Sequence, residues 1–406
     1  MVSTRESLKA WLRLSLTPGV GNLTTRSLLQ AFGRPEIIFE QSASALQSIV
    51  SGPVSQQLRL VPPELEETLE TASNWRQAQG GSSALKVLQK RILTLKDDDY
   101  PSTLLRMPDP PLLLYVLGQT QHLHLLSPPL DRAPQALAVV GSRNPTPQGR
   151  LNSHDFALHL AQAGLTVISG LALGVDTAAH QGALQGGHPH HPLHTVAVVG
   201  TGLDRVYPHQ NHALAIEIAT HGLLISEYHL NTPPITSNFP KRNRLIAGLS
   251  QGCLVVVAAP RSGSLITARQ TLDMGKEVFA IPGSIHTTVS KGCHDLIKQG
   301  AKLVDCVQDI LEELKDLPEA PSLATKGPLV SKPTMPLSPL LIDVQMSASP
   351  LKVIDHLGQD PVGLDELQLR SGLPIAQLQA ELFQLEMRGA LGRLSGGLYQ
   401  KLNRQR

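Results

Sequence analysis

Short apolar runs alternate with helical patterns between residues 137 and 280. The runs that predict strands are Leu137–Val140, Thr166–Ser169, Thr195–Val199, Leu223–Ser226, Cys253–Ala258 and Glu277–Ala280. Apolar residues recur at helical spacing near Gln148–Ala163, Asp176–Gln185, Asn211–His221, Arg242–Gly248 and Ser264–Met274. This alternation predicts an α/β protein with a Rossmann-like, doubly wound parallel sheet, whose ligands bind beyond the carboxyl ends of the strands.

Helical patterns predominate before residue 85. Leu8–Leu16, Thr24–Phe32 and Glu64–Gln79 have the apolar spacing of helices, and the residues Thr-Pro-Gly-Val-Gly at 17–21 separate the first two. Such a hairpin can present backbone N–H groups to a DNA phosphate, or it can simply let two helices pack closely. We expect a helical domain of the helix-hairpin-helix kind over residues 1–85, and both roles of its hairpin stay open.

The segment that follows belongs with the sheet, in a domain that we place at residues 86–316. Arg91–Leu95 predicts a strand, and Pro108–Leu117 predicts a loop that enters another. The acidic run Asp97–Asp99 stands beside Tyr-Pro and predicts a turn rather than a metal site. Gln119–Gln135, with its three prolines, predicts a loop insertion.

The C-terminal part of the chain is a separate region. Seven prolines fall between residues 318 and 350, so we place a linker at 317–349 and a compact domain at 350–406. Three helical patterns (Leu351–Leu357, Leu364–Arg370 and Ile375–Arg388) precede two short strands within 389–402. This order predicts a winged helix. Its third helix has few basic residues, which favours a protein-binding or architectural role over reading of DNA.

Composition narrows the class of protein. Aromatic residues are only 3% of the 406 residues, which argues against broad base-stacking surfaces, and the net charge of +2 permits a local basic patch without requiring one. The three cysteines show no CxxC spacing, so a reducing cytoplasm is expected. We find no signal-peptide pattern and no apolar run of membrane-spanning length, and therefore expect no membrane partner.

A first candidate anion site follows the strand at 137–140. Gly141, Ser142 and Arg143 form a small turn that leads into a helix, where backbone N–H groups and the helix dipole favour negative charge. The Arg143 guanidinium can bind a phosphate through two parallel hydrogen bonds. A tight strand-to-helix turn without a ligand is the alternative. No loop here matches GxGxxG or GxxxxGK[ST], so neither NAD nor ATP is indicated and we expect no cofactor.

Two further segments strengthen the nucleic-acid hypothesis. The first combines Phe239, Lys241, Arg242, Asn243 and Arg244, and the second is Arg261-Ser262-Gly263-Ser264 at another helix start. A basic cluster with one aromatic ring offers phosphate attraction together with a surface for one base, as single-stranded nucleic acid requires. A solvated helix start is the alternative for the basic cluster. We expect the glycine-containing loops after the strands, including 169–170 and 200–202, to converge at one edge of the sheet.

Other polar residues invite catalytic or metal interpretations. Ser169, Asp176 and His180 could suggest a triad, but Asp176 and His180 are four residues apart on one helix, and we expect a structural His–Asp pair. The histidines at 188, 190, 191 and 194 have no cysteine or carboxylate to complete a metal site, so we expect none. Cys253 begins a buried strand and is expected in the core.

At these motifs the chain resembles the DprA family of DNA-processing proteins. The segments GSR, SGLAxGxDxxAH, TGLDRxYPxxN, LxSEY, FPxRNRxIAGLS, RSGSLxTA and EVFAxPG follow in this order from Gly141 to Gly283. The resemblance implies a SAM-like N-terminal region, a winged helix, and a dimeric mediator that protects incoming single-stranded DNA and loads RecA during natural transformation. The DNA-binding positions that it implies are Gly141, Ser142, Arg143, Phe239, Lys241, Arg242, Asn243, Arg244, Arg261, Ser262, Gly263 and Ser264.

Two other functions compete with this hypothesis. Rossmann-like relatives cleave nucleotides, and Asp176 or Glu227 could serve as the acid–base group of such a phosphoribohydrolase-like enzyme. We expect no enzyme, because no paired carboxylates lie near the glycine loops and no nucleophile has a neighbouring base. A regulator that binds duplex DNA through the winged helix is disfavoured by the weakly basic third helix.

Overall fold

The computed structural model describes residues 5–78, 88–128, 135–187, 191–314, 353–357, 361–394 and 396–402. The chain divides into two compact units, Met1–Asp316 with Arg404–Arg406, and Leu317–Asn403. The linker that we predict at 317–349 lies outside the described residues. In the described ranges no helix is both long enough and apolar enough to cross a membrane.

A nine-stranded sheet forms the centre of the first unit, in the order β1-β2-β6-β5-β4-β3-β7-β8-β9. The strands are β1 (Gln89–Thr94), β2 (Leu113–Gly118), β3 (Ala136–Val140), β4 (Thr166–Ser169), β5 (Thr195–Val198), β6 (Leu223–Ser226), β7 (Gly252–Val255), β8 (Glu277–Ala280) and β9 (Lys302–Leu303). All neighbouring pairs from β6 to β9 are parallel, whereas β1–β2 and β2–β6 are antiparallel. The predicted Rossmann-like parallel sheet is confirmed.

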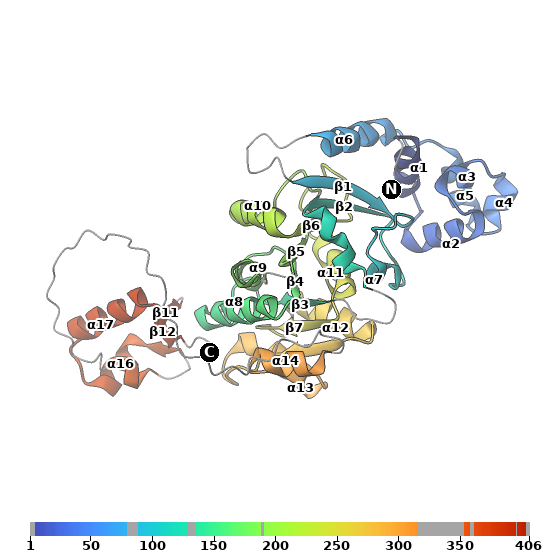
Figure 1. The fold of residues 1–406 in the computed structure, drawn as a ribbon. Coiled ribbons are helices and arrows are strands. Elements are labelled where there is room, and N and C mark those ends of the chain that lie inside the picture. Colours follow the sequence, from blue (N-terminus) through green and yellow to red (C-terminus); the bar gives the residue numbers. More distant parts are fainter. Residues whose placement is uncertain are drawn as a thin grey trace, which may run out of the picture. The chain divides into compact units, whose positions relative to one another are not determined.

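Helices cover both faces of this sheet (Figure 1). One layer contains α8 (Pro147–Gln162), α9 (Val175–Gly186) and α10 (His212–His221), and the other contains α11 (Asn238–Leu249) and α12 (Ser264–Asp273). Alternate residues of a strand point to opposite faces of the sheet and pack against different helix layers. Ala138 of β3 belongs to the same core as leucines of α11, and Ala197 of β5 belongs to the same core as residues of α10. Burial on both faces explains why the strands are almost wholly apolar.

The N-terminal helices share a core with the sheet. They are α1 (Arg5–Leu16), α2 (Asn22–Phe32), α3 (Pro35–Phe39), α4 (Ala43–Gln47), α5 (Gly52–Arg59) and α6 (Leu65–Gln77). Trp11 and Leu69 belong to the same buried cluster as Ile92 of β1, and the ring of Trp75 packs edge-on against Tyr115 of β2 at 5.9 Å. Residues 5–78 are therefore packed onto the sheet, and the status of 1–85 as a separate domain stays a prediction.

The segment at 119–135 differs from the predicted loop insertion. A 3₁₀ helix spans Thr120–Leu126, and its Leu123 and Leu126 are buried in the core beside the sheet. The loop prediction is wrong over this part, because the prolines that suggested it stand after these two leucines, and residues 129–134 lie outside the described ones. The remaining helices of the unit are α7 (Ser102–Leu105), α13 (Lys291–Lys298) and α14 (Val307–Glu313).

The second unit is a small winged helix, as predicted. It contains α15 (Val353–His356), β10 (Val362–Gly363), α16 (Leu364–Ser371), α17 (Ile375–Met387), β11 (Leu391–Leu394) and β12 (Leu398–Lys401). The strands form an antiparallel sheet in the order β10-β12-β11. Leu367 of α16 and Leu378, Leu382 and Leu385 of α17 are the centre of its core.

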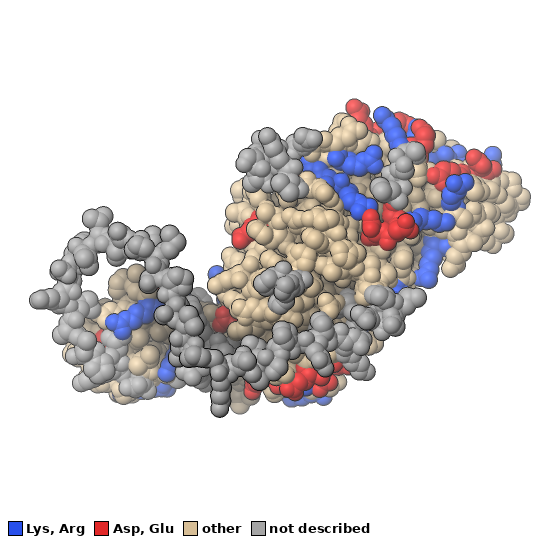
Figure 2. Space-filling model, in the orientation of Figure 1, with Lys and Arg blue, Asp and Glu red and all other residues tan. Residues whose placement is uncertain are grey.

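Charged side chains are unevenly distributed on the face seen in Figure 2. Lys and Arg gather together with Asp and Glu over β1 and the N-terminal helices, whereas the surface over α8, α9 and α10 is almost free of charge (Figure 2). Within the residues visible on this face there is no continuous basic track over α8–α10 that could follow a nucleic-acid backbone.

Candidate nucleic-acid interface

The strand order places the candidate site. From β3 the chain adds β4, β5 and β6 on one side, and it then returns to add β7, β8 and β9 on the other. The loops that follow β3 and β7 therefore separate, and they leave a crevice beyond the carboxyl ends of these two neighbouring strands. The loop after β3 contains Gly141–Arg143. The loop after β7 contains Arg261, Ser262 and Gly263, and Ser264 is the first residue of α12.

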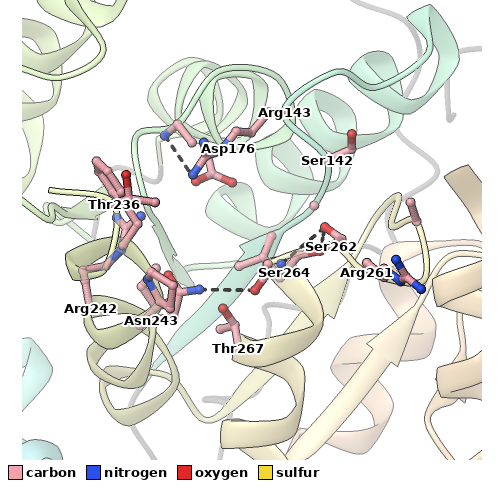
Figure 3. Close-up of a pocket in the computed structure, with 18 of the residues that line it drawn as sticks. Ser142, Arg143, Asp176, Thr236, Arg242, Asn243, Arg261, Ser262, Ser264 and Thr267 are labelled. Atoms are coloured by element: carbon pink, nitrogen blue, oxygen red, sulfur yellow. Dashed lines mark hydrogen bonds between the residues drawn. The ribbon is translucent and has the colours of Figure 1, made fainter. Parts of the chain in front are cut away.

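A pocket of about 530 Å³ occupies this crevice (Figure 3). The five connections that run from a strand to the next helix, from β3–α8 to β7–α12, all supply residues to its lining. They include Gly141, Ser142, Arg143, Ala172, Asp176, Tyr207, Pro234, Thr236, Phe239, Arg242, Asn243, Arg261, Ser262, Gly263, Ser264 and Thr267. Of the predicted DNA-binding positions, only Lys241 and Arg244 are absent from this lining.

Backbone hydrogen bonds to two other segments hold the Gly141–Arg143 loop in place. Ser142 donates its N–H to the carbonyl of Val257 at 2.7 Å, and its own carbonyl accepts from the N–H of Val175 at 3.1 Å. Gly174 has a φ of +84°, and a Cβ there would collide with the carbonyl oxygens of Ser142 and Arg143. The loop is thus held rigidly, while the Arg143 side chain is exposed at the pocket.

Aromatic rings stand at the edge of the pocket. Phe239 lies 5.4 Å from Tyr207 between ring centroids, with the planes tilted by 33°, and the Arg143 guanidinium lies 5.7 Å from the Phe239 centroid. Tyr207 is 44% exposed. We did not predict Tyr207 as a site residue, although it follows β5 and so had to lie at the carboxyl edge of the sheet.

Helix α11 begins at Asn238, four residues earlier than the start that we predict at Arg242. The basic cluster therefore lies within the helix, where successive side chains diverge by about 100°. Lys241 is exposed, Arg242 is buried, and Asn243 faces the pocket. Arg244 is half-buried against Glu227 and Asp109. The sequence cluster is thus split into side chains with different environments.

Arg242 lies at the inner wall of the pocket and is 5% exposed. It donates to the carbonyl of Gly170 at 2.6 Å and to that of Val198. Burial lowers its pKa to about 10, and the nearby Asp176 carboxylate opposes that shift. Arg242 therefore joins the ends of β4 and β5 through its Nη1 atom, which donates to both carbonyls.

Asp176 is hydrogen-bonded to the backbone of its own loop. Its carboxylate accepts from the N–H groups of Gly170 at 3.1 Å and Ala172 at 3.3 Å. Burial raises its pKa, and Arg242 and these hydrogen bonds oppose the shift. These contacts fix the loop after β4 to the start of α9.

The predicted His180–Asp176 pair is wrong. His180 is fully buried and its Nδ1 lies 2.7 Å from Thr195 Oγ1, while the Thr195 hydroxyl donates to the carbonyl of Val167. His180 Nδ1 must then donate, and burial lowers the pKa of the ring to about 3. Asp176 instead accepts from the amides of Gly170 and Ala172, before α9. The two side chains are therefore one helical turn apart and bind different partners. Ser169 donates to the carbonyl of Val139.

The Arg261–Ser264 loop connects to α11. Asn243 Nδ2 donates to the carbonyl of Gly263 at 3.3 Å, and the hydroxyls of Ser262 and Ser264 lie 2.7 Å apart (Figure 3). These hydroxyls stand at the first turn of α12, which is a favourable place for an anion. Arg261 is exposed beside them.

The other predicted features lie away from the pocket. Thr201, in the loop after β5, is 1% exposed and does not line it. Cys253 is fully buried, as predicted. Asp97 closes a turn by accepting from the N–H of Thr94 at 2.8 Å. His188 and His190 lie outside the described residues.

Comparison with known proteins identifies the family. The family model described as DNA recombination-mediator protein A matches residues 91–315, which is more than half of the chain. The chain belongs to the DprA family. The model of the DprA winged helix domain matches residues 332–397.

Individual DprA relatives are similar over much of their length. Protein Smf of Escherichia coli is 38% identical over 318 residues, which are 77% of this chain and 78% of that protein. The DNA processing protein DprA of Streptococcus pneumoniae is 45% identical over 222 residues, 55% of this chain and 73% of that protein. An X-ray structure of DprA from Streptococcus pneumoniae covers 78% of this chain and 99% of its own, with a TM-score of 0.60 and 33% identity.

Proposed function

We propose that this DprA family member binds single-stranded DNA in the pocket between the loops after β3 and β7. The observation that carries the proposal is the meeting of three anion-binding elements in one crevice: the Gly141–Arg143 loop, the start of α11 and the start of α12. Arg143, Lys241 and Arg261 are exposed at or beside it. None of these three forms an ion pair in the described part of the chain.

The aromatic pair favours a single strand over a duplex. Tyr207 and Phe239 offer ring surfaces at the pocket edge, and a base can stack there only after it has left its neighbours. A duplex presents its phosphates but keeps its bases stacked. The exposed cations would attract either form, so the preference for single strands rests on the rings.

The family extends the proposal from binding to a cellular role. A recombination mediator holds a single strand and delivers it to a recombinase, and we propose RecA as that recombinase, with incoming DNA of natural transformation as the strand that is protected. We further propose that the chain acts as a homodimer in the cytoplasm. The family description as a recombination mediator supports this role.

We also propose that the pocket is not catalytic. Asp176 is the one carboxylate in the described lining, and it is bonded to two backbone amides. Glu227, the other candidate acid–base group, is ion-paired with Arg244. Steady release of a base from a nucleoside monophosphate, abolished by Asp176→Asn, would support the phosphoribohydrolase alternative instead.

A salt titration tests the binding proposal. Single strands should bind more tightly than duplex, and Arg143→Ala and Lys241→Ala should each weaken binding and reduce the slope of log affinity against log salt by about 0.7, the value for one phosphate contact on a single strand. Lys298→Ala, which removes an exposed lysine outside the pocket lining, is the matched control. Equal affinity for duplex, or unchanged slopes in both variants, would contradict the proposal.

A further inference from the structure

All three nitrogens of the Arg244 guanidinium contact oxygen atoms of the protein. Its Nε lies 3.3 Å from a carboxylate oxygen of Asp109, its Nη1 donates to the Asp109 carbonyl at 2.8 Å, and its Nη2 bonds to Glu227. Only 13% of the side chain is exposed. A guanidinium whose fork already holds three oxygens has little left to offer a phosphate.

Glu227 and Arg244 depend on each other. Burial raises the pKa of Glu227, and the Arg244 charge opposes that shift. Loss of Arg244 would leave the Glu227 carboxylate without its ion-pair partner, in a site where both side chains are 13% exposed. The pair therefore fixes α11, which carries Arg244, to the end of β6, which precedes Glu227.

The segment around Asp109 forms a support beneath α11. Gly248 of α11 lies so close to Leu104 and Met107 that a Cβ there would overlap the Met107 side chain. The hydroxyl of Tyr100, which is buried, donates to the carbonyl of Pro111 at 2.8 Å and closes the segment from the other side. Residues 104–111 are thus in direct contact with the middle and the C-terminal part of α11.

Helix α2 binds the same segment. Arg26 donates to the carbonyls of Met107 at 3.2 Å and Pro108 at 3.4 Å, and Asn22 donates to the carbonyl of Asp109 at 3.3 Å. The Asp109 carbonyl consequently accepts from α2 and from Arg244 of α11 at once. Figure 1 shows α7, at the start of this segment, between α2 and α11.

We propose that Arg244 is a positioning residue of the DNA site, and that it places α11 on the 104–111 segment and thereby on α2. The inference rests on the proposed function. Phe239 and Asn243 enter the pocket from α11, so the placement of this helix sets the pocket geometry. A displacement of α2 would therefore be transmitted through the shared Asp109 carbonyl to these two residues.

Single-strand binding by full-length variants across a range of salt tests this assignment. Arg244→Ala should weaken binding at least about fivefold, with the wild-type salt slope, because no phosphate contact is lost. Arg244→Lys should restore little, since an ammonium cannot replace the fork. Glu227→Gln should also weaken binding, although it removes a negative charge. Lys241→Ala, with its reduced slope, serves as the reference for a true phosphate contact.

Arg26→Ala tests the link to α2 with little risk to folding, because Arg26 is exposed. It should weaken binding with an unchanged salt slope. Arg34→Ala should have no effect, because this exposed arginine of the same helical region has no side-chain hydrogen bond or ion pair within the described ranges. A reduced slope in Arg244→Ala, tighter binding by Glu227→Gln, or wild-type binding by Arg26→Ala would overturn the inference. Absence of single-strand binding in the wild type would instead overturn the proposed function.

Discussion

His229 is a half-buried histidine whose tautomer is fixed by two hydroxyl groups. Ser15 donates to the carbonyl of Leu12 at 2.8 Å, so it accepts from His229 Nε2 at 3.1 Å. The Tyr115 hydroxyl then donates to Nδ1 at 2.9 Å. Burial lowers the pKa of His229 to about 4, and this neutral ring joins α1 to the sheet. A proton on Nδ1 of His229 would make that nitrogen a donor, and the Tyr115 hydroxyl could then no longer donate to it.

This arrangement predicts a pH dependence of stability. When the pKa of a histidine is lower in the folded than in the unfolded state, its contribution to the free energy of unfolding is fully present above the unfolded pKa of about 6.5. That contribution is lost as the pH falls toward the folded pKa of about 4. His229→Asn should therefore reduce the change in unfolding free energy between pH 6.5 and 4 by up to about 1.4 kcal/mol per pH unit relative to wild type. Urea titrations followed by tryptophan fluorescence measure it.

His212→Gln is the control for this prediction, because that side chain is exposed on α10. It should leave the pH dependence of the unfolding free energy unchanged. A His229→Asn protein with the wild-type pH dependence would show that His229 titrates normally in the folded state.

At the residue scale, the sequence identified the right segments but not every side chain that faces the pocket. Gly141–Arg143 and Arg261–Ser264 were predictable, because loops after parallel strands lie at one edge. The roles of Arg242 and Arg244 were not, because four adjacent residues diverge around a helix whose start was placed four residues late. Neither the hydrogen bond from Arg242 to Gly170 nor the pair of Arg244 with Glu227 leaves a local pattern in sequence.

At the element scale, the start of α9 controls the Gly141–Arg143 loop. Gly174 precedes this helix in a left-handed conformation and contacts the carbonyl groups of Ser142 and Arg143. Gly174→Ala adds a Cβ where two oxygens already lie, and it also strains the backbone by about 1–3 kcal/mol. It should lower the free energy of unfolding and, by displacing the loop, weaken single-strand binding.

Gly164→Ala provides a matched control in the turn between α8 and β4. Gly164 has a φ of +83°, but a Cβ there would meet nothing within 4 Å. Both variants should lose stability, and only Gly174→Ala should lose DNA affinity, as a binding assay on folded protein would measure. Equal effects of the two substitutions on affinity would mean that the loop tolerates displacement.

The elements themselves were largely predictable where their patterns were long. The strands β3 to β8 appear as apolar runs because both of their faces are covered by helices. The two-residue β9 is too short to leave such a run. The 3₁₀ helix at Thr120–Leu126 was missed because nearby prolines suggested a loop, while burial of Leu123 depends on tertiary packing.

At the scale of the whole molecule, the pocket and the winged helix belong to different units. All residues that line the pocket fall within Met1–Asp316, and so do both tryptophans, Trp11 and Trp75. A chain that ends at Asp316 should therefore fold with the same tryptophan fluorescence and keep most of its affinity for single strands. The 350–406 fragment should bind DNA weakly at best, since α17 contains no Lys or Arg.

Gel shifts with single-stranded DNA, run on these two fragments and on the full chain, measure how much each unit contributes to the affinity. Loss of single-strand binding in a folded chain ending at Asp316 would transfer the main DNA contact to the winged helix. Recombinase loading is expected to persist in the fragment ending at Asp316 if the residues that contact the recombinase also belong to the first unit.

The location of the pocket leaves the opposite edge of the sheet free to vary. The histidine-rich stretch at 187–194 leads into β5, and the stretch at 119–135 leads into β3, so both enter the sheet at the amino ends of strands. Lengthening a loop costs little entropy. A longer loop at this edge also leaves the strand-to-helix loops that line the pocket unchanged, because those loops lie at the opposite edge. Apart from the buried Leu123, Leu126 and Leu193, relatives can therefore gain or lose residues here while the chemistry at the other edge stays constant.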